Sequence, residues 1–363
     1  MLWMSHRIRT FFAALTSAAA SLVVASSVLA QTPIPAEPDT PFKLASFGAA
    51  GKVRLGLVLA KHVLDIGEAN EHLIQRTGVS RMTIPDDMRG LIEEYDRVSS
   101  RLYQIANFFG DLKLEELDFA FLVDEASLKA PIKYPYNLLA AAANYRSHAA
   151  EMDVARAIDP DRDDPYLFAK SPRSCIIDPG EPFVIPPGRK RIDWEGELAV
   201  VMGAPATRVS LHEALDHVFG FTIMYDVSDR GGGTRANPTF PGPDWFSGKS
   251  RDGAAPMGPF IVPKEFLPNH ANLRLVTRVN DRMVQDARTS EMIYDIEHLI
   301  RYITSIMTLY PGDVISTGTP DGVGAARKPP EFLKPGDVVS IEIEGIGTLK
   351  TPIQAASSAP TRN

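Results

Sequence analysis

The stretch Asp193-Trp194-Glu195-Gly196-Glu197-Leu198-Ala199-Val200-Val201-Met202-Gly203 places two carboxylates two residues apart at the start of an apolar run. Successive side chains of a β-strand point to opposite faces, so Glu195 and Glu197 are predicted to project to the same side. Neighbouring acids repel each other unless a positive group lies between them, and a hard divalent cation is the usual partner. The alternative is a solvated strand face. The same spacing recurs at residues 342–344, so spacing alone does not separate the two interpretations.

The first 30 residues have the pattern of a signal peptide. Arg7 and Arg9 precede an apolar, uncharged run, and Val28-Leu29-Ala30 ends in small residues that signal peptidase recognises. An uncleaved membrane anchor is the competing interpretation, because the run approaches spanning length. We expect cleavage after Ala30 and export to the periplasm or beyond the cell, with no stable membrane insertion of the mature chain.

Charge and cysteine content exclude several classes of function. The chain has 363 residues and a net charge of −7, and removal of the signal peptide with its two arginines makes this −9. This acidity argues against nucleic acid as the partner. Cys175 is the single cysteine, which excludes an internal disulfide and a zinc–thiolate cluster.

The order of turn residues and apolar runs predicts the domain organisation. Strands are expected at 42–47 and 52–59, and apolar residues every three or four positions between Leu91 and Phe109 indicate an amphipathic helix. Short strands with Gly/Pro turns dominate after residue 165, so the fold class is predicted as α+β, mainly β. The predicted parts are a linker at 31–41, a small α+β domain at 42–125, a second domain at 131–353 and a flexible tail at 354–363.

A histidine and an acid lie three residues apart in Asn144-Tyr145-Arg146-Ser147-His148-Ala149-Ala150-Glu151. On a helix, these two side chains share a face, and the acid can orient the ring and raise its basicity. A surface pair without chemistry is the alternative. The acidic residues at 153–164 lack the glycine and terminal glutamate of a calcium loop, so a mobile charged loop is predicted there.

Two further segments carry polar residues at positions typical of a site. The run from His217 to Tyr225 reads as a buried strand, and Asp226 follows its end, where a third metal ligand could lie. Ser247-Gly248-Lys249-Ser250 ends like a phosphate-binding loop, but Pro243 stands where that motif requires its first glycine. Nucleotide binding is therefore not supported.

Five motifs occur in an order that resembles the fumarylacetoacetate hydrolase superfamily. They are Asn144 to Glu151, Asp193 to Ala199, Asp226-Val227-Ser228, Gly248-Lys249-Ser250, and Gly318-Thr319-Pro320-Asp321-Gly322-Val323-Gly324. The resemblance covers roughly 131–353, and 42–125 resembles the small N-terminal domain that many members have. It implies a β-roll catalytic domain of the acylpyruvate hydrolase type, preceded by that small domain.

The resemblance also implies a metal and its ligands. Mg²⁺ or Mn²⁺ is expected on Glu195, Glu197 and Asp226, which suits oxygen-only ligands. The repeated pair, Glu342 and Glu344, matches no ligand of the family, so these two side chains are predicted to lie on a solvated face.

The implied reaction is hydrolysis of a carbon–carbon bond in an acylpyruvate-like or fumarylacetoacetate-like 1,3-dicarbonyl acid, through an enolate. His148 and Glu151 would deprotonate the attacking water, and Lys249 would neutralise the developing oxyanion. Arg230 would bind a substrate carboxylate and Thr319 would hydrogen-bond it. The chain departs from the family at 229–231, where Asp229-Arg230-Gly231 replaces Ala-Arg-Asp.

Other functions use the same residues. An isomerase of 2-hydroxy-dienoates or an oxaloacetate decarboxylase needs enolate stabilisation without an attacking water. A non-catalytic exported protein that binds organic acids would retain the metal pocket but has no need of a base. In each case the expected ligand is a small 2-oxo acid, and the resemblance implies a homodimer.

Overall fold

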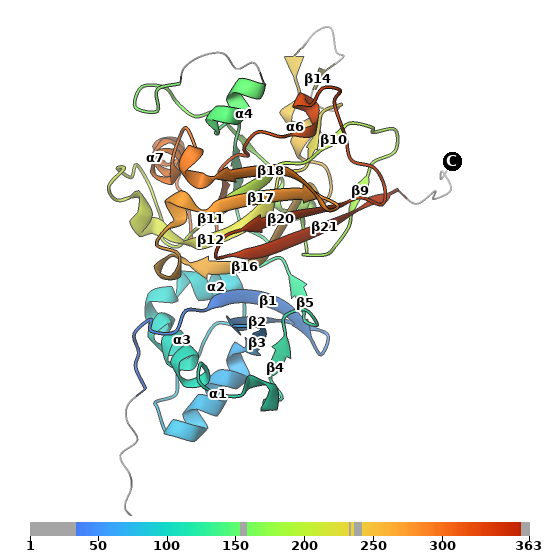
Figure 1. The fold of residues 1–363 in the computed structure, drawn as a ribbon. Helices are drawn as coiled ribbons and strands as arrows, with labels where there is room; N and C mark the ends of the chain where they lie inside the picture. Colours follow the sequence, from blue (N-terminus) through green and yellow to red (C-terminus); the bar gives the residue numbers. More distant parts are fainter. Residues whose placement is uncertain (1–33, 153–157, 232–233, 236–241, 357–363) are drawn as a thin grey trace, which may run out of the picture. The chain divides into compact units, whose positions relative to one another are not determined.

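The computed structural model describes residues 34–152, 158–231, 234–235 and 242–356 (Figure 1). The predicted signal peptide lies outside these ranges, as do residues 31–33, 153–157 and 357–363 of the predicted linker, charged loop and tail. Within the described ranges, no helix combines the length and apolar character needed to cross a bilayer.

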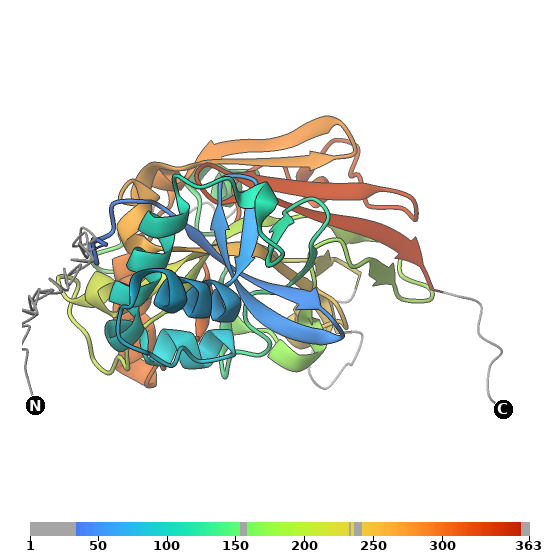
Figure 2. The same cartoon turned by 90° about the horizontal axis from the view of Figure 1, so that it is seen from below.

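The N-terminal module consists of a small antiparallel sheet and three helices. Its elements are β1 (Lys43–Ala49), β2 (Lys52–Leu59), β3 (His62–Asp65), α1 (Ile66–Thr77), α2 (Met88–Glu93), α3 (Tyr95–Phe109), η1 (Leu114–Glu116), β4 (Ala120–Leu122) and β5 (Ser127–Lys129). The predicted helix from Leu91 to Phe109 is two helices, because the chain leaves helical geometry at Glu94. Figure 2 shows the helices on one face of the strands. Their apolar faces are buried there, which explains the periodicity in the sequence.

The rest of the described chain is mainly β. Its elements are β6 (Leu138–Ala141), α4 (Arg146–Glu151), β7 (Leu167–Ala169), α5 (Pro172–Cys175), β8 (Ile176–Ile177), β9 (Phe183–Ile185), β10 (Ile192–Asp193), β11 (Gly196–Met202), η2 (Ala214–His217), β12 (Val218–Tyr225), β13 (Ser228–Asp229), β14 (Thr234–Arg235), β15 (Gly242–Pro243), α6 (Trp245–Lys249), β16 (Ala255–Pro263), η3 (Lys264–Phe266), η4 (His270–Asn272), β17 (Arg274–Val279), β18 (Arg282–Arg288), η5 (Thr289–Glu291), α7 (Ile296–Ile306), β19 (Val314–Ser316), η6 (Gly324–Ala326), β20 (Val338–Ile343) and β21 (Gly347–Ala355). The predicted class, α+β and mainly β, is confirmed.

One large sheet runs through both predicted domains. Its strand order is β4-β3-β2-β1-β16-β12-β11-β19-β6-β7, with β5 added on β1 and β8 on β16. The two parts of the chain meet where β1 pairs antiparallel with β16, with Leu44 opposite Ile261. A second sheet has the order β18-β17-β20-β21-β9. The division at 125–131 therefore falls between strands of a continuous sheet.

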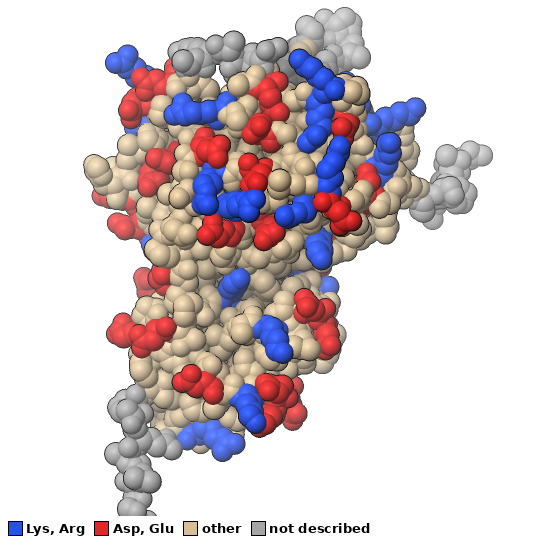
Figure 3. Space-filling view, in the orientation of Figure 1, with Lys and Arg blue, Asp and Glu red and all other residues tan. Residues whose placement is uncertain are grey.

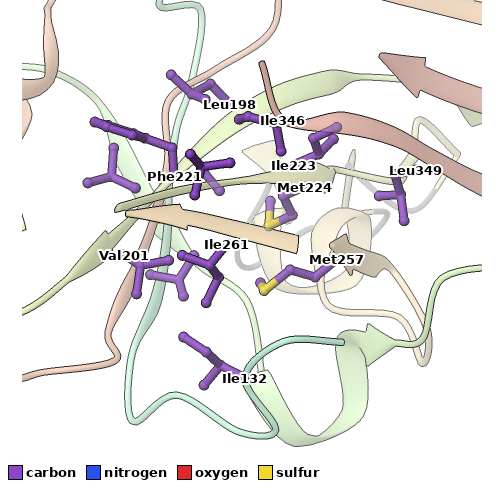
Figure 4. Close-up of a cluster of buried hydrophobic side chains, with 14 of the residues drawn as sticks. Ile132, Leu198, Val201, Phe221, Ile223, Met224, Met257, Ile261, Ile346 and Leu349 are labelled. Atoms are coloured by element: carbon purple, nitrogen blue, oxygen red, sulfur yellow. The ribbon is translucent and has the colours of Figure 1, made fainter. Parts of the chain in front are cut away.

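The core of the part after residue 131 forms where three strands of the large sheet are buried along their whole length. All residues of β11, β12 and β16 are buried, so these strands have apolar neighbours on both faces. Figure 4 shows side chains from this region, including Leu198, Ile223 and Met257, near Leu349 of β21 and Ile346 of the turn between β20 and β21, all in one hydrophobic cluster. This double burial explains the continuous apolar run in the sequence, since a strand with one solvated face would alternate.

The outer face of the second sheet is charged and exposed. Lysine, arginine and acidic residues are interspersed on the face seen in Figure 3. Glu342 and Glu344 are exposed, and Arg278 Nη1 lies 3.2 Å from Glu342 Oε2. The prediction of a solvated face for this pair is confirmed. The predicted start of the flexible tail is wrong by two residues, because Gln354 and Ala355 pair with Val184 and Ile185 of β9.

Candidate active site

Three buried carboxylates meet where β11 begins and β12 ends. Glu195 immediately precedes β11, Glu197 lies within it, and Asp226 immediately follows β12. The two strands are antiparallel with Gly196 opposite Tyr225, so the start of one lies beside the end of the other. Each acid offers an oxygen that lies within 4.8 Å of the other two. The chain thus brings together the three predicted metal ligands.

Three cations lie against these acids. Lys249 Nζ donates to Glu195 Oε2, Asp226 Oδ2 and Ser228 Oγ, at 2.6 Å in each case. Lys170 Nζ donates to Asp226 Oδ1 at 2.5 Å, and the Lys170 side chain has no exposed surface. Arg230 bonds to Glu195 and, through Nε, to Asp193 Oδ2 at 2.9 Å. Pairing offsets part of the free-energy cost of taking these charges out of water, and removal of one partner would leave a buried charge uncompensated.

The cations do not neutralise all the acids equally. Although burial opposes its ionisation, Lys249 and Arg230 hold the pKa of Glu195 below its usual range. Burial, together with Asp226 and Glu195, instead raises the pKa of Glu197 to about 8. Among the described residues, Glu197 accepts hydrogen bonds from the Ser316 hydroxyl and the Gly318 N–H, whereas Glu195 and Asp226 accept from lysine or arginine. A further cation beside Glu197 would therefore be favourable.

The donor set fits a hard divalent cation. The three acids contribute only oxygen atoms, which Mg²⁺ and Mn²⁺ prefer. Lys249 Nζ contacts two of the same carboxylates, so an ion bound there would share Glu195 and Asp226 with this ammonium group.

The predicted histidine–acid pair forms on the short helix α4. His148 Nδ1 and Glu151 Oε1 are 2.7 Å apart, and the His148 side chain is buried. Glu151 Oε2 accepts a hydrogen bond from the Gly322 N–H at 2.9 Å. Because Nδ1 is engaged by the carboxylate, Nε2 is the ring nitrogen left to accept a proton. His148 lines the same pocket as Glu195 and Glu197.

One loop, residues 317–322, donates backbone hydrogen bonds both to the carboxylate cluster and to Glu151 of the histidine–acid pair. The Gly318 N–H donates to Glu197 Oε2 at 2.9 Å, while Gly322 holds Glu151. The φ angles of the two glycines are +91° and +97°, a region that other residues rarely adopt. A Cβ at Gly318 would lie 2.8 Å from Asn144 Cβ. The Gly-Thr-Pro-Asp-Gly motif is explained by this geometry.

Arg230 and Thr319 lie at the pocket, and Arg230 Nε, Arg230 Nη2 and the Thr319 hydroxyl are bound to protein groups. The Arg230 guanidinium is held by two acids, as described above. Thr319 Oγ1 donates to the Gly196 carbonyl at 2.9 Å and accepts from Gln285 Nε2 at 2.8 Å. Their predicted contacts with substrate stay predictions, and the contacts present position Glu195 and the start of β11.

A pocket of about 460 Å³ opens over the carboxylate cluster. Its wall is largely apolar and aromatic. The described residues that line it are Ala141, Ala142, Ala143, His148, Met152, Tyr166, Phe168, Glu195, Glu197, Arg230, Trp245, Lys249 and Thr319. A site of this volume is within the range that holds small organic ligands.

Residues 137–354 match the family described as fumarylacetoacetate (FAA) hydrolase C-terminal. The chain belongs to this family. The match covers more than half of the sequence and includes the acid cluster, the histidine–acid pair and the 317–322 loop. The predicted family and the FAH-type fold are thereby confirmed.

Relatives of this FAA hydrolase family protein include enzymes of several kinds. A mitochondrial oxaloacetate tautomerase of Homo sapiens is 40% identical over 225 residues, which are 62% of this chain and 68% of the human protein. The structure of a fumarylacetoacetate hydrolase from Exiguobacterium antarcticum is 32% identical with a TM-score of 0.68, and the match covers 87% of this chain and 100% of that one. The family relationship therefore indicates an enzyme and leaves the reaction type open.

A third relative bears on the metal. The structure of a maleylpyruvate hydrolase from Sphingobium sp. SYK-6, in complex with manganese(II) ion and pyruvate, is 27% identical to this chain with a TM-score of 0.65. It matches 86% of this chain and 99% of its own.

The site contains residues that the sequence did not single out. Lys170 pairs with Asp226, and Asp193 accepts hydrogen bonds from the Gly324 N–H at 2.6 Å and the Ala325 N–H at 3.0 Å. Asp229, which stands where the family pattern has alanine, accepts a hydrogen bond from Arg251 Nε at 3.1 Å. A signal existed for Asp193, since it opens the same motif as Glu195; an isolated lysine offers none.

Proposed function

We propose that this protein is a divalent-metal-dependent hydrolase that cleaves the carbon–carbon bond of an acylpyruvate-like or fumarylacetoacetate-like 1,3-dicarbonyl acid. The observation that carries the proposal is the His148–Glu151 pair, which faces the same pocket as the carboxylate cluster. A protein that only binds organic acids needs no such base. A pocket that joins a base to a metal site suits water attack on a carbonyl next to an enolisable 2-oxo acid.

The chain's own residues account for the proton transfers. His148 takes a proton from water on Nε2, and Glu151 stabilises the imidazolium through Nδ1–H. The water oxygen bonds to the acyl carbonyl carbon, and the bond from that carbon to the methylene then breaks. The electron pair of that bond goes to the enolate of pyruvate, and the acyl fragment with the water oxygen leaves as the carboxylic acid. His148 Nε2 returns its proton to the methylene carbon of the enolate, which gives pyruvate. In this proposal Lys249 stabilises the developing oxyanion through its positive charge, because its three N–H groups already donate to Glu195, Asp226 and Ser228.

The metal would be held by Glu195, Glu197 and Asp226. When bound, Mg²⁺ or Mn²⁺ supplies positive charge that binds the 2-oxo acid and favours enolate formation. The acids are held for this role by Ser316 Oγ and the Gly318 N–H on Glu197, and by Lys170 on Asp226.

Product analysis in water enriched in heavy oxygen tests the reaction type. A hydrolase incorporates the label from water into the carboxylic acid product, and the His148→Ala variant loses turnover. Pyruvate release from an acylpyruvate without label, or activity that survives His148→Ala, contradicts hydrolysis by this pair.

A tautomerase acting on oxaloacetate is the second candidate. It is favoured by the 40% identity to the human mitochondrial oxaloacetate tautomerase. The same histidine would then move a proton between carbon and oxygen without an attacking water. Isomerisation of 2-hydroxy-dienoates and decarboxylation of oxaloacetate would use the same site. Incubation with oxaloacetate distinguishes these outcomes, because decarboxylation releases CO₂ and tautomerisation changes only the enol absorbance.

We also propose export and dimerisation, on the basis of the N-terminal sequence and the family. Expression of the full chain with its first 30 residues in a bacterium tests export. The mature protein is expected outside the cytoplasm with Gln31 as its first residue. Light scattering of the purified protein gives the oligomeric state, which we expect to be a homodimer.

A further inference from the structure

Three aromatic side chains form a continuous row along the wall of the active-site pocket. The ring centroids of Phe168 and Trp245 are 5.1 Å apart, and those of Trp245 and Tyr166 are 5.3 Å apart. At the buried end, Lys249 Nζ lies 5.1 Å from the centroid of the Phe168 ring. At the other end, Tyr166 is 57% exposed. The row leads from the carboxylate cluster to solvent.

The secondary structure explains why the row is built this way. Tyr166 and Phe168 are two residues apart at β7, so both rings point to the same face of the strand. Trp245 and Lys249 are one turn apart on α6, so the helix presents its indole and its ammonium group on one side. Asp244 caps this helix by accepting a hydrogen bond from the Ser247 N–H at 3.0 Å. This cap makes Trp245 the first residue of α6.

The cations that line the pocket are bound to acids at its floor. The described lining residues include one lysine, Lys249, and one arginine, Arg230. Lys249 donates to Glu195 and Asp226, and Arg230 donates to Asp193. His148 is held by Glu151. The aromatic end of the described wall thus presents rings, together with Met152, and no cation to receive a second carboxylate.

We propose that the row Tyr166–Trp245–Phe168 is the subsite for the acyl group, and that the preferred substrate carries an aromatic or bulky apolar acyl group. This inference rests on the proposed function and names its substrate class. The 2-oxo acid end lies at the carboxylate cluster, and the acyl end stacks on the rings. A small dicarboxylate such as oxaloacetate leaves the row uncovered and places its second charge against an apolar wall.

A series of acylpyruvates that differ at the acyl group tests the subsite. We expect kcat/KM for benzoylpyruvate to exceed that for acetylpyruvate and for succinylpyruvate by about tenfold or more, which is the scale of one aromatic contact and the apolar area it buries. Trp245→Ala should remove most of this preference and change acetylpyruvate little. Phe246→Ala is the matched control, because Phe246 is the next residue, is 75% exposed and is not among the pocket-lining residues.

A binding measurement separates this inference from the hydrolase proposal. Calorimetry with phenylpyruvate and pyruvate, in the presence of Mg²⁺, needs no turnover. If no acylpyruvate is cleaved but phenylpyruvate binds about tenfold more tightly than pyruvate, and Trp245→Ala abolishes the difference, the subsite stands and the hydrolase proposal fails. Equal binding of the two acids, or a preference for succinylpyruvate, overturns the subsite. Tyr166→Ala replaces Trp245→Ala if circular dichroism shows that the latter does not fold.

Discussion

Replacing Glu151 with glutamine tests the proton-transfer pair with little change in shape. Glu151 uses both carboxylate oxygens as acceptors, one for His148 Nδ1–H at 2.7 Å and one for the Gly322 N–H at 2.9 Å. A glutamine amide has only one acceptor oxygen, so its NH₂ group must face one of these two donors. Either orientation removes the negative charge beside the imidazole.

The expected loss follows from that single contact. A hydrogen bond to a charged group contributes about 1.5–3 kcal/mol. If this contribution is present when the imidazole is protonated and absent when it is neutral, Glu151→Gln raises the barrier by the same amount. At 1.36 kcal/mol per factor of ten, kcat falls roughly 10- to 150-fold.

Single-turnover kinetics on the best acylpyruvate, with a Mn²⁺ titration of each variant, provide the assay. The metal affinity should stay the same, because no described hydrogen bond joins Glu151 to Glu195, Glu197 or Asp226. Asp295→Asn is the control: Asp295 caps α7, its Oδ1 lies 2.7 Å from Nδ1 of His298 three residues later, and neither residue is among the described lining residues of the pocket. An unchanged kcat, or a loss of metal affinity that accounts for the loss of rate, refutes the assigned role.

Three further predictions concern the metal, the loop and pH. Mg²⁺ or Mn²⁺ at one hundred times its Kd should stabilise the wild type by ~2.7 kcal/mol in thermal denaturation, and Glu197→Gln should lose this response while the exposed Glu342→Gln keeps it. Gly322→Ala should lower the free energy of unfolding in urea by ~1–3 kcal/mol more than Gly336→Ala does. Both glycines have a φ of +97°, but only at Gly322 would the new Cβ collide with a carbonyl oxygen, that of Val284, at 2.0 Å. Equal losses in the two variants would contradict this reason. Burial and Glu265 raise the pKa of Tyr103 from 10.0 to about 12, which favours the protonated phenol in the folded state. This contribution to the free energy of unfolding is present below pH 10 and is lost as the pH rises to 12. Tyr103→Phe should therefore reduce the fall of the urea midpoint between pH 10 and pH 12.

The carboxylate cluster could be predicted because its information is local. Glu195 immediately precedes β11 and Glu197 lies within it, and a short motif places Asp226 at the end of β12. The pair on α4 is also local, since His148 and Glu151 share one turn of helix. The spacing alone does not distinguish these acids from Glu342 and Glu344, because the burial of a carboxylate depends on which strands become its neighbours. The order of the other motifs was needed to separate the two pairs.

Other features depend on contacts between distant parts of the chain. Lys170 directly follows β7, which pairs with β6. There its ammonium group contacts Asp226, 56 residues away in the sequence. The two bonds that occupy Thr319 come from Gly196 and Gln285, which no spacing in the sequence connects to it. Residues 354–355 form strand because β9 accepts them in parallel, although their composition resembles that of a frayed end.

The pairing of β1 with β16 has a consequence for how this chain can be divided. Phe260 of β16 packs with Ala45, Phe47, Val58 and Val63 of the N-terminal module, and Lys43 Nζ lies 5.6 Å from its ring centroid. A fragment that begins at residue 131 would leave this side of β16 without its partner strand and expose an apolar edge, a common starting point for aggregation. The N-terminal module therefore covers this edge of β16, and we expect a fragment that begins at residue 131 to aggregate unless another strand covers the edge.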